Sequence, residues 1–192
     1  MTASIRPYRA DDRADVYDVC VRTAAVGADA TGMYSTDDLM PDVFAGPYLD
    51  LQPDLAWVID TGTRVAGYVI AAADTRAFVA RLRDEWLPGF ASKYREHSSA
   101  DEWVVALGLD PERMLVPEVD DYPAHLHIDV LPELQGHGWG RTLIETLRGE
   151  LGRRGVPGVH LTVDPANLPA RAFYHRLGFV ELPSGALGSA SL

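Results

Sequence analysis

The chain has 192 residues, of which 47% are hydrophobic, enough to bury the core of a single domain. Its 28 acidic residues outnumber 17 basic ones and give a formal net charge of −11, which disfavours nucleic acid and anionic membrane surfaces as partners. The apolar stretches have strand length and the first residues lack the apolar segment of a signal peptide, so we expect a cytoplasmic protein without a transmembrane helix. Cys20 is the single cysteine and falls in an apolar helical pattern, so we expect it to be buried without a disulfide.

The N-terminal part of the chain predicts a strand, a helix and a β-hairpin. Alternation of apolar and polar residues over 5–9 predicts the strand, and Asp11 and Asp12 are placed to cap the helix that follows. Two apolar runs separated by a Gly-containing turn, at 55–60 and 65–73, predict the hairpin. The second run is almost wholly apolar, which is typical of a central strand covered on both faces.

The rest of the chain predicts a helical insertion followed by alternating strands and helices. Residues 75–123 indicate the insertion, which is helical at first and then irregular, acidic and rich in proline. Apolar periodicity and capping signals predict the other elements: short helices at 37–44 and 101–109, strands at 125–131, 159–163 and 179–182, and helices at 141–151 and 170–177. The tail after residue 182 is small and polar, so we expect it to fray or to add at most a short edge strand.

One stretch, HLHIDVLPELQGHGWG over residues 125–140, combines a strand that stops at Pro132, a glycine-rich turn and the start of a helix. Gly136, Gly138 and Gly140 let the backbone approach a ligand closely. The first turn of the helix offers unpaired N–H groups and the positive end of its dipole to an anion. The stretch therefore predicts a binding site for phosphate groups.

Spacing excludes two common nucleotide-binding motifs. The glycines run G-H-G-W-G late in the chain, which differs from the G-x-G-x-x-G that follows the first strand of a dinucleotide fold. A P-loop ends in Gly-Lys-Ser/Thr after a longer spacer, whereas this loop ends Gly140-Arg141-Thr142 without that spacer.

A third pattern fits. Residues 130–140 resemble the acetyl-CoA motif of the GNAT N-acetyltransferases, Arg/Gln-x-x-Gly-x-Gly/Ala, with Gln135, Gly138 and Gly140 at the defining positions. Residues 167–179, NLPARAFYHRLGF, resemble the second signature of that family, and two motifs in the right order are more specific than one. The resemblance implies an α/β (α+β) GNAT fold in one domain over 1–192. Such a fold has a mixed, mostly antiparallel sheet with a V-shaped split near Val130, flanked by helices.

A narrower resemblance covers most of the chain. Residues 5–20, 84–94 and 161–179 are similar to the acetyltransferase-like C-terminal domains of O-GlcNAcases, which implies a free-standing relative of those domains. The animal domains lack an intact Gln-x-x-Gly-x-Gly loop, and this chain retains it. We therefore take the cofactor site from the GNAT pattern.

The GNAT resemblance implies that acetyl-CoA lies along the strand and the loop. The backbone N–H groups of the loop are expected to hold the pyrophosphate, and the strand is expected to pair with the pantetheine amides. The implied cofactor-binding residues are Asp129, Val130, Leu131, Gln135, Gly136, His137, Gly138, Trp139, Gly140, Arg141, Asn167, Phe173 and Tyr174. Asn167 would hydrogen-bond the pantetheine and Phe173 would pack on it, although Asn167 also suits an ordinary turn and Trp139 an ordinary core or surface aromatic.

Three residues are candidates for the chemistry. The family pattern implies that Tyr174 protonates the departing thiolate, which suits a phenol with a pKa of about 10; a core tyrosine is the alternative. Period-two alternation places His127 and Asp129 on one face of the strand, so either is a candidate general base. The alternatives are a solvated polar face and an Asp129 that anchors a loop. The oxyanion is expected at a backbone N–H near Asp129 or Val130.

The sequence thus predicts acetyl transfer from acetyl-CoA to a primary amine of a small molecule or peptide, by a monomer or homodimer that binds neither nucleic acid nor membrane. The alternatives are a pseudo-acetyltransferase that binds acetyl-CoA or CoA without turnover, and an interaction domain without enzymatic activity. Tyr34, Asp120, Asp121 and Tyr122 lie in segments that could line the acceptor pocket. One cysteine and the absence of Cys/His ligand spacing predict no metal site.

Overall fold

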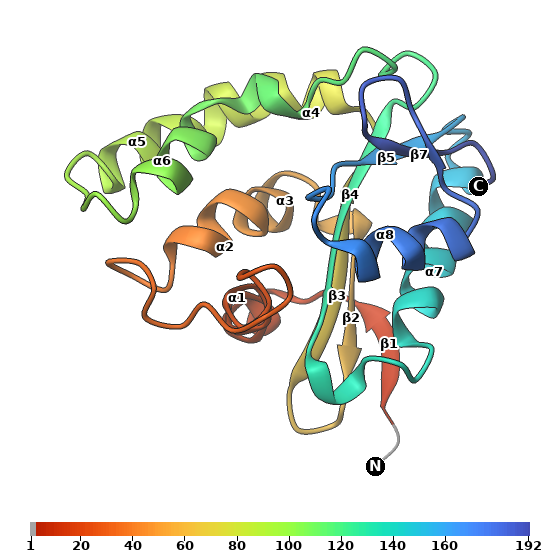
Figure 1. Cartoon of the computed structure of the whole chain (residues 1–192), viewed down its shortest axis with the longest axis horizontal. Helices are drawn as coiled ribbons and strands as arrows, with labels where there is room; N and C mark the ends of the chain where they lie inside the picture. The colour runs from red at the N-terminus through yellow and green to blue at the C-terminus, as the bar shows by residue number, and fades with distance from the viewer. Residues whose placement is uncertain (1–2) are drawn as a thin grey trace.

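The computed structural model describes residues 3–192, and its strands form one seven-stranded sheet (Figure 1). The strands are β1 (Ser4–Pro7), β2 (Ala56–Asp60), β3 (Val65–Ala72), β4 (Ala124–Val130), β5 (Val159–Leu161), β6 (Val180–Glu181) and β7 (Leu187–Ser189). They lie in the order β1-β2-β3-β4-β5-β7-β6, and every neighbouring pair is antiparallel except β4 with β5. The predicted mixed, mostly antiparallel sheet is confirmed.

Helices cover both faces of the sheet. They are α1 (Arg13–Val21), α2 (Leu39–Phe44), α3 (Gly46–Leu51), α4 (Thr75–Arg81), α5 (Leu87–Lys93), α6 (Glu102–Leu109), α7 (Trp139–Arg153) and α8 (Leu168–Arg176). Four 3₁₀ turns, η1 (Ala10–Asp12), η2 (Pro53–Leu55), η4 (Pro111–Met114) and η5 (Pro132–Leu134), and one π-turn, η3 (Leu82–Trp86), complete the regular structure of the described part. Figure 1 shows α1, α2 and α3 on one side of β3 and β4, and α7 and α8 on the other.

Two apolar clusters fill the space on either side of the sheet. One joins α1, α3 and α4 to Tyr68 and Ile70 of β3, and the other joins α7 and α8 to Val69 and Ala71 of the same strand. Every residue of β3 is buried, so the predicted hairpin and its doubly covered second strand are both confirmed. Cys20 also lies in the first cluster and is buried, as expected.

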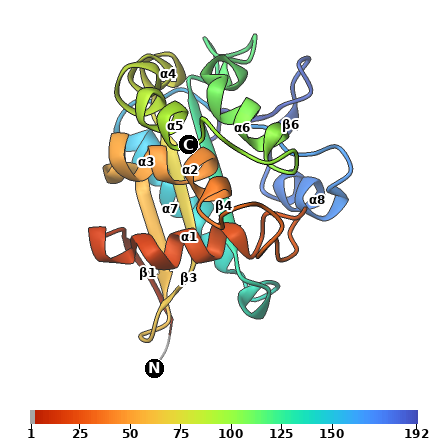
Figure 2. The same ribbon diagram turned by 90° about the vertical axis from the view of Figure 1, so that its left-hand side faces the viewer.

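The predicted insertion forms a long helical arm. Residues 75–93 are helical without a break, because α4 passes through η3 into α5, and α6 packs back against α5. Pro88 has no N–H to donate, and the wider π-turn just before it accommodates the interruption within the helix. Figure 2 shows α2 between α1 and the pair formed by α5 and α6.

The predicted cap of α1 differs from the structure. Asp12 does precede α1, but its carboxylate makes no bond to that helix. Instead Oδ2 accepts the backbone N–H of Arg9 at 2.8 Å, and both carboxylate oxygens accept from Arg6 at 2.7 Å. Asp12 therefore caps the preceding turn η1 and fixes β1 to it.

Helix α3 was not predicted. Five of its six residues, Gly46, Pro47, Tyr48, Leu49 and Leu51, are buried, and Asp50 is exposed beside Arg13. A helix of six residues with a single polar position is too short and too apolar to produce a helical period in the sequence. The segment packs against the sheet and against the helical arm, so all of its apolar residues are covered.

The tail also corrects an expectation. β7 is an internal strand that pairs with β5 on one side and β6 on the other, and all three of its residues are buried. Its small residues are a packing requirement, because a Cβ on Gly188 would lie 2.9 Å from side-chain atoms of Leu182 and Tyr122. Over residues 3–192 the structure has no helix with the length and apolarity needed to span a membrane.

Candidate active site

The sheet splits between β4 and β5. β4 pairs with β3 along its whole length, but its parallel register with β5 includes only Ala124 and His125. Beyond His125, β5 and β7 turn away from β4 (Figure 1). The side of β4 that follows His125 therefore faces an opening in the sheet, and this opening begins earlier than the predicted position near Val130.

The hydrogen bonds of β4 show which backbone groups face the opening. Leu131 N–H donates to the Ala66 carbonyl of β3 at 3.0 Å, whereas Ala124 N–H donates to the Gly158 carbonyl on the β5 side at 3.2 Å. Because backbone groups alternate in direction along a strand, Asp129 also bonds toward β3, while Ile128 and Val130 point into the opening. Of the three residues expected to pair with pantetheine, only Val130 presents its backbone there.

The glycine loop connects this strand to α7. Gly136 and Gly138 have φ of 77° and 88°, in the left-handed region that favours glycine, and Gly138 is the N-cap residue of α7. The first helical acceptor is the Gly138 carbonyl, which takes the N–H of Thr142 at 3.1 Å. The N–H groups of Trp139 to Arg141 thus lack acceptors within the helix and point toward its N-terminal side. This geometry suits an anion, as the sequence predicted.

Gln135 fixes the loop to the end of the strand. Its Nε2 donates to the Val130 carbonyl at 2.8 Å. The carbonyl of Val130 therefore already has a hydrogen-bond partner in the protein. Within residues 3–192 the N–H of Val130 remains free to bond a ligand in the opening.

Gly140 serves helix packing. A Cβ at this position would lie 3.1 Å from the ring of Phe173, so α7 and α8 approach each other there. Phe173 and Trp139 are both partly buried against the cluster formed by α7, α8 and the sheet. His137 and Arg141 are exposed, and Arg141 lies 3.6 Å from Glu145.

Asn167 has a structural role as the cap of α8, which differs from the ordinary turn considered for it. Its Oδ1 accepts the N–H of Ala170 at 3.1 Å and caps α8. Its side-chain NH₂ group makes no hydrogen bond to the rest of residues 3–192, so it is available to a ligand.

Tyr174 lies at the opening with a buried ring and an accessible hydroxyl. The side chain packs between Phe173 and Phe179, and the residue is 8% exposed. Burial, and then the charge of Asp129, raise the pKa of the phenol above its ordinary value. Within the described chain the hydroxyl makes no hydrogen bond. Its oxygen is also not fully enclosed by other atoms. The hydroxyl oxygen therefore reaches the surface.

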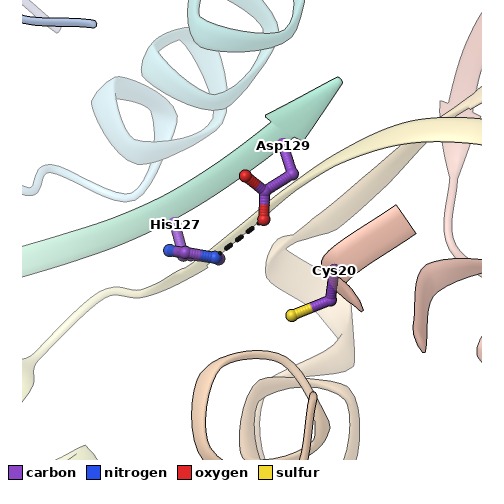
Figure 3. A group of neighbouring side chains, drawn as sticks. All are labelled: Cys20, His127 and Asp129. Carbon is purple, nitrogen blue, oxygen red and sulfur yellow. Dashed lines mark ion pairs between the residues drawn. The ribbon is translucent and has the colours of Figure 1, made fainter. Parts of the chain in front are cut away.

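His127, Asp129 and Cys20 converge on the opposite face of the sheet from Tyr174 (Figure 3). His127 Nε2 lies 2.9 Å from Asp129 Oδ2, and the Tyr68 hydroxyl donates to the same oxygen at 2.5 Å. Cys20 points toward them from α1, and burial raises the pKa of its thiol, which stays protonated. The structure thus brings together the two predicted base candidates.

The same three side chains are the place in residues 3–192 where a metal ion could be held. Their donor atoms lie within 4.8 Å of one another and include the thiolate, imidazole and carboxylate ligands that Zn²⁺ prefers. No pattern of residue spacing indicates this cluster, because Cys20 lies in α1, far from β4 along the chain. Binding would require the buried thiol to lose its proton.

His125 shares a strand face with His127 but has a structural role. Its Nδ1 and Nε2 lie 2.8 Å from Thr75 Oγ1 and the Tyr48 hydroxyl respectively. Burial lowers the pKa of His125 to about 3, so the ring is neutral at pH 7.

Phe44 and Tyr68 are site residues that sequence reasoning missed. The Phe44 ring stacks on His127 with centroids 5.9 Å apart, and Tyr68 lies at the same centroid distance on a tilted plane. The only signal for Tyr68 was a hydroxyl within an otherwise apolar strand. Phe44 gave none.

The residues considered for an acceptor pocket are placed elsewhere by their contacts. Tyr34 packs on the cluster of α2, α5 and α6, and Tyr122 packs beside Leu182. Asp120 forms an exposed ion pair with Arg76 at 2.9 Å. No hydrogen bond, ion pair or ring contact within residues 3–192 joins these side chains to His127 or Asp129.

A split mixed sheet, with a glycine loop that opens a helix beside the split, is the arrangement of a GNAT fold. Residues 24–179 match the model of the Acetyltransferase (GNAT) family, and the chain belongs to that family.

Similar proteins agree with this assignment. The crystal structure of SsHAT superposes over 100% of both chains with a TM-score of 0.93 and 50% identity. Protein O-GlcNAcase of Rattus norvegicus is 25% identical over 189 residues, which cover 93% of this chain and 20% of that protein. The chain thus spans about a fifth of that relative's length. A GNAT family acetyltransferase from Brucella melitensis, in complex with acetyl-CoA, shares the fold at 16% identity and a TM-score of 0.52 over 98% of this chain and 87% of that one.

Proposed function

We propose that this chain transfers the acetyl group of acetyl-CoA to a primary amine. The observation that carries the proposal concerns the split between β4 and β5. A candidate base lies on one face of the sheet beside this split, and a candidate acid lies on the other face. Tyr174 reaches the opening from the α8 side, and its hydroxyl makes no hydrogen bond to the other described residues. His127 and Asp129 lie on the α1 side of the sheet.

The cofactor would lie along β4 and end at α7. Backbone groups of Ile128 and Val130 suit the amides of pantetheine, and the N–H groups at the start of α7 suit the pyrophosphate. The acetyl carbonyl would then lie near the N–H of Val130, which can donate to the oxyanion that forms on attack.

The base and the acid of the proposed reaction lie on opposite faces of the sheet. The amine must lose a proton to attack the acetyl carbon, and His127 is the base that can take it. Protonated His127 would form an ion pair with Asp129, which Tyr68 holds in place. After attack, the nitrogen of the tetrahedral intermediate loses its second proton to solvent. As the carbon–sulfur bond breaks, the thiolate takes a proton from the Tyr174 hydroxyl, and solvent returns a proton to the phenolate. Release of the proton on His127 to solvent completes the cycle, and the products are the acetylated amine, CoA and one net proton.

Two measurements test this function. Calorimetry with acetyl-CoA should show binding, and absence of binding at millimolar concentration would exclude the cofactor assignment and favour an interaction domain. Release of free CoA should then be followed over amino sugars, polyamines, amino acids and lysine peptides. Binding without CoA release for every acceptor would support a pseudo-acetyltransferase.

A further inference from the structure

Arg113 presents a cation beside the candidate active site. It lies in η4, directly after α6, and is partly buried. Its Nε donates to the Leu107 carbonyl at 2.9 Å, and its guanidinium carbon lies 5.2 Å from the centre of the Phe44 ring. The guanidinium is therefore fixed at its base and covered on one side by an aromatic ring.

Arg113 differs from the other partly buried arginines of residues 3–192 because its guanidinium neither contacts a carboxylate within 4.0 Å nor donates from its terminal nitrogens, although the charge of Asp110 lies near enough to act on its pKa. Five of the others contact a carboxylate within 4.0 Å: Arg6, Arg13, Arg22, Arg64 and Arg171. Arg148 uses its terminal nitrogens on the Leu177 carbonyl and the Ser189 hydroxyl at 2.8 Å. Arg113 makes neither kind of contact with its terminal nitrogens.

These nitrogens are accessible to a ligand. Among the described residues, two side-chain N or O atoms are both fully enclosed and without a hydrogen-bond partner: Glu118 Oε2 and Arg148 Nε. Nη1 and Nη2 of Arg113 also have no partner in this part of the chain. Since they do not belong to that enclosed set, they reach the surface. Burial lowers the pKa of Arg113, which nevertheless remains a cation because arginine is protonated at any physiological pH. A partly desolvated cation without a partner is unfavourable, and an anion would relieve that cost.

The position of Arg113 points to the acceptor and not to the cofactor phosphates. The turn η4 lies at the first end of β4, because its Met114 carbonyl is 3.3 Å from Nε2 of His160, which is the register partner of His125 in β5. α7 and its loop follow the other end of β4. The two ends are separated by roughly 20 Å of extended strand. Phe44 lies 5.9 Å from the His127 ring, so the guanidinium of Arg113 is within about 11 Å of the imidazole.

We propose that Arg113 binds an anionic group of the acceptor, so that the acceptor is an amine that also carries a carboxylate or a phosphate. This inference rests on the proposed acetyl transfer. The amine would lie at His127 and the anion at Arg113, with the connecting chain over the ring of Phe44. The forked guanidinium can donate two parallel N–H bonds to either anion.

Matched acceptors test the inference on the unaltered protein. γ-Aminobutyrate and ε-aminocaproate are compared with n-propylamine and n-pentylamine, which lack the carboxylate, and phosphoethanolamine is compared with ethylamine. We expect kcat/KM for CoA release to favour the anionic member of a pair by at least about tenfold, mostly through KM. The two sets of pairs distinguish a carboxylate from a phosphate. Equal kcat/KM within every pair would overturn the inference.

Variants assign the preference to Arg113. Arg113→Gln should reduce the ratio between anionic and neutral amines toward one, and Arg113→Lys should retain part of it, since a point charge replaces the fork. Arg83→Gln is the matched control. Arg83 is an exposed cation that pairs with Glu112, the neighbour of Arg113 in η4. A preference that survives Arg113→Gln in a folded variant, checked by thermal unfolding, would also overturn the inference.

A binding measurement separates this inference from the proposed function. Calorimetry with ε-aminocaproate in the presence of CoA is run on the unaltered protein and on both Arg113 variants. If no amine is acetylated but ε-aminocaproate binds and Arg113→Gln abolishes binding, the anion site stands and acetyl transfer fails. If amines are acetylated without a difference between charged and neutral members, acetyl transfer stands and the anion site fails.

Discussion

The hydroxyl of Tyr68 donates a hydrogen bond of 2.5 Å to Oδ2 of Asp129, directly across the strand pair β3 and β4. Burial raises the pKa of Tyr68 well above its ordinary value, so the phenol remains a neutral donor at any physiological pH. Tyr68 therefore fixes the carboxylate that lies beside His127.

Asp129 and His127 should act as a unit. Asp129→Asn leaves a neutral amide beside the imidazolium that forms on proton abstraction, so we expect kcat to fall about 100-fold. His127→Ala should cost a similar amount, and the double variant little more than either single one, because both remove the same step. Steady-state kinetics with purified variants check this. A rate and pH profile that Asp129→Asn leaves intact would show that Asp129 only anchors the strand.

Tyr174→Phe tests the proton donor. It keeps the packing between Phe173 and Phe179 and removes only the accessible hydroxyl, so kcat should fall about 100-fold while the affinity for acetyl-CoA changes little. Calorimetry and CoA release measure the two quantities. Tyr8→Phe, just after edge strand β1, is the control for loss of a phenol. Equal losses of kcat and affinity in Tyr174→Phe would assign the residue to packing.

Gly138→Ala should weaken both the fold and cofactor binding. No atom lies within 4 Å of the added Cβ, so the cost is the left-handed backbone at φ 88°, about 1 to 2 kcal/mol. Relief of that strain would move the N–H groups at the start of α7 and reduce affinity for acetyl-CoA. Gly149→Ala is the matched control, because Gly149 lies within α7 with space for a Cβ and no positive φ. It should stabilise the protein by about 0.5 to 1 kcal/mol, and urea unfolding distinguishes the two.

His125 should make the fold sensitive to acid. The unfolded chain binds a proton at His125 near pH 6.5, whereas the folded chain binds it only near pH 3. Stability is therefore complete above about pH 6.5 and is lost between that value and about pH 3, by up to about 1.4 kcal/mol per pH unit. Urea unfolding of His125→Asn should show a smaller loss between pH 7 and pH 5 than the unaltered protein. An equal loss in both would assign the acid sensitivity to other groups.

The sequence predicted those parts of the site that are local in the chain. The glycine loop before α7 depends on a few consecutive residues, so its spacing is visible without a structure. Tyr68 and Asp129 are 61 positions apart, and only the register of β3 with β4 makes them neighbours. Phe44 lies against His127 and Arg113 lies against Phe44 through the packing of α2 against the helical arm, which no pattern of spacing encodes.

The same limit applies to the fold. Strands and helices with one polar face were predicted, whereas α3 was missed because it is short and only Asp50 of its six residues is exposed. β7 was underestimated because small residues were taken as a sign of fraying, although Gly188 is required by the contact with Leu182.

The split beside β4 has a consequence for the protein without its co-substrate. Ile128 and Val130 present an unprotected strand edge inside the sheet, and such an edge can recruit a strand from another chain and start aggregation. Pantetheine bound along this edge would act as the missing strand. Acetyl-CoA should therefore slow amide hydrogen exchange at these two residues and delay aggregation on heating.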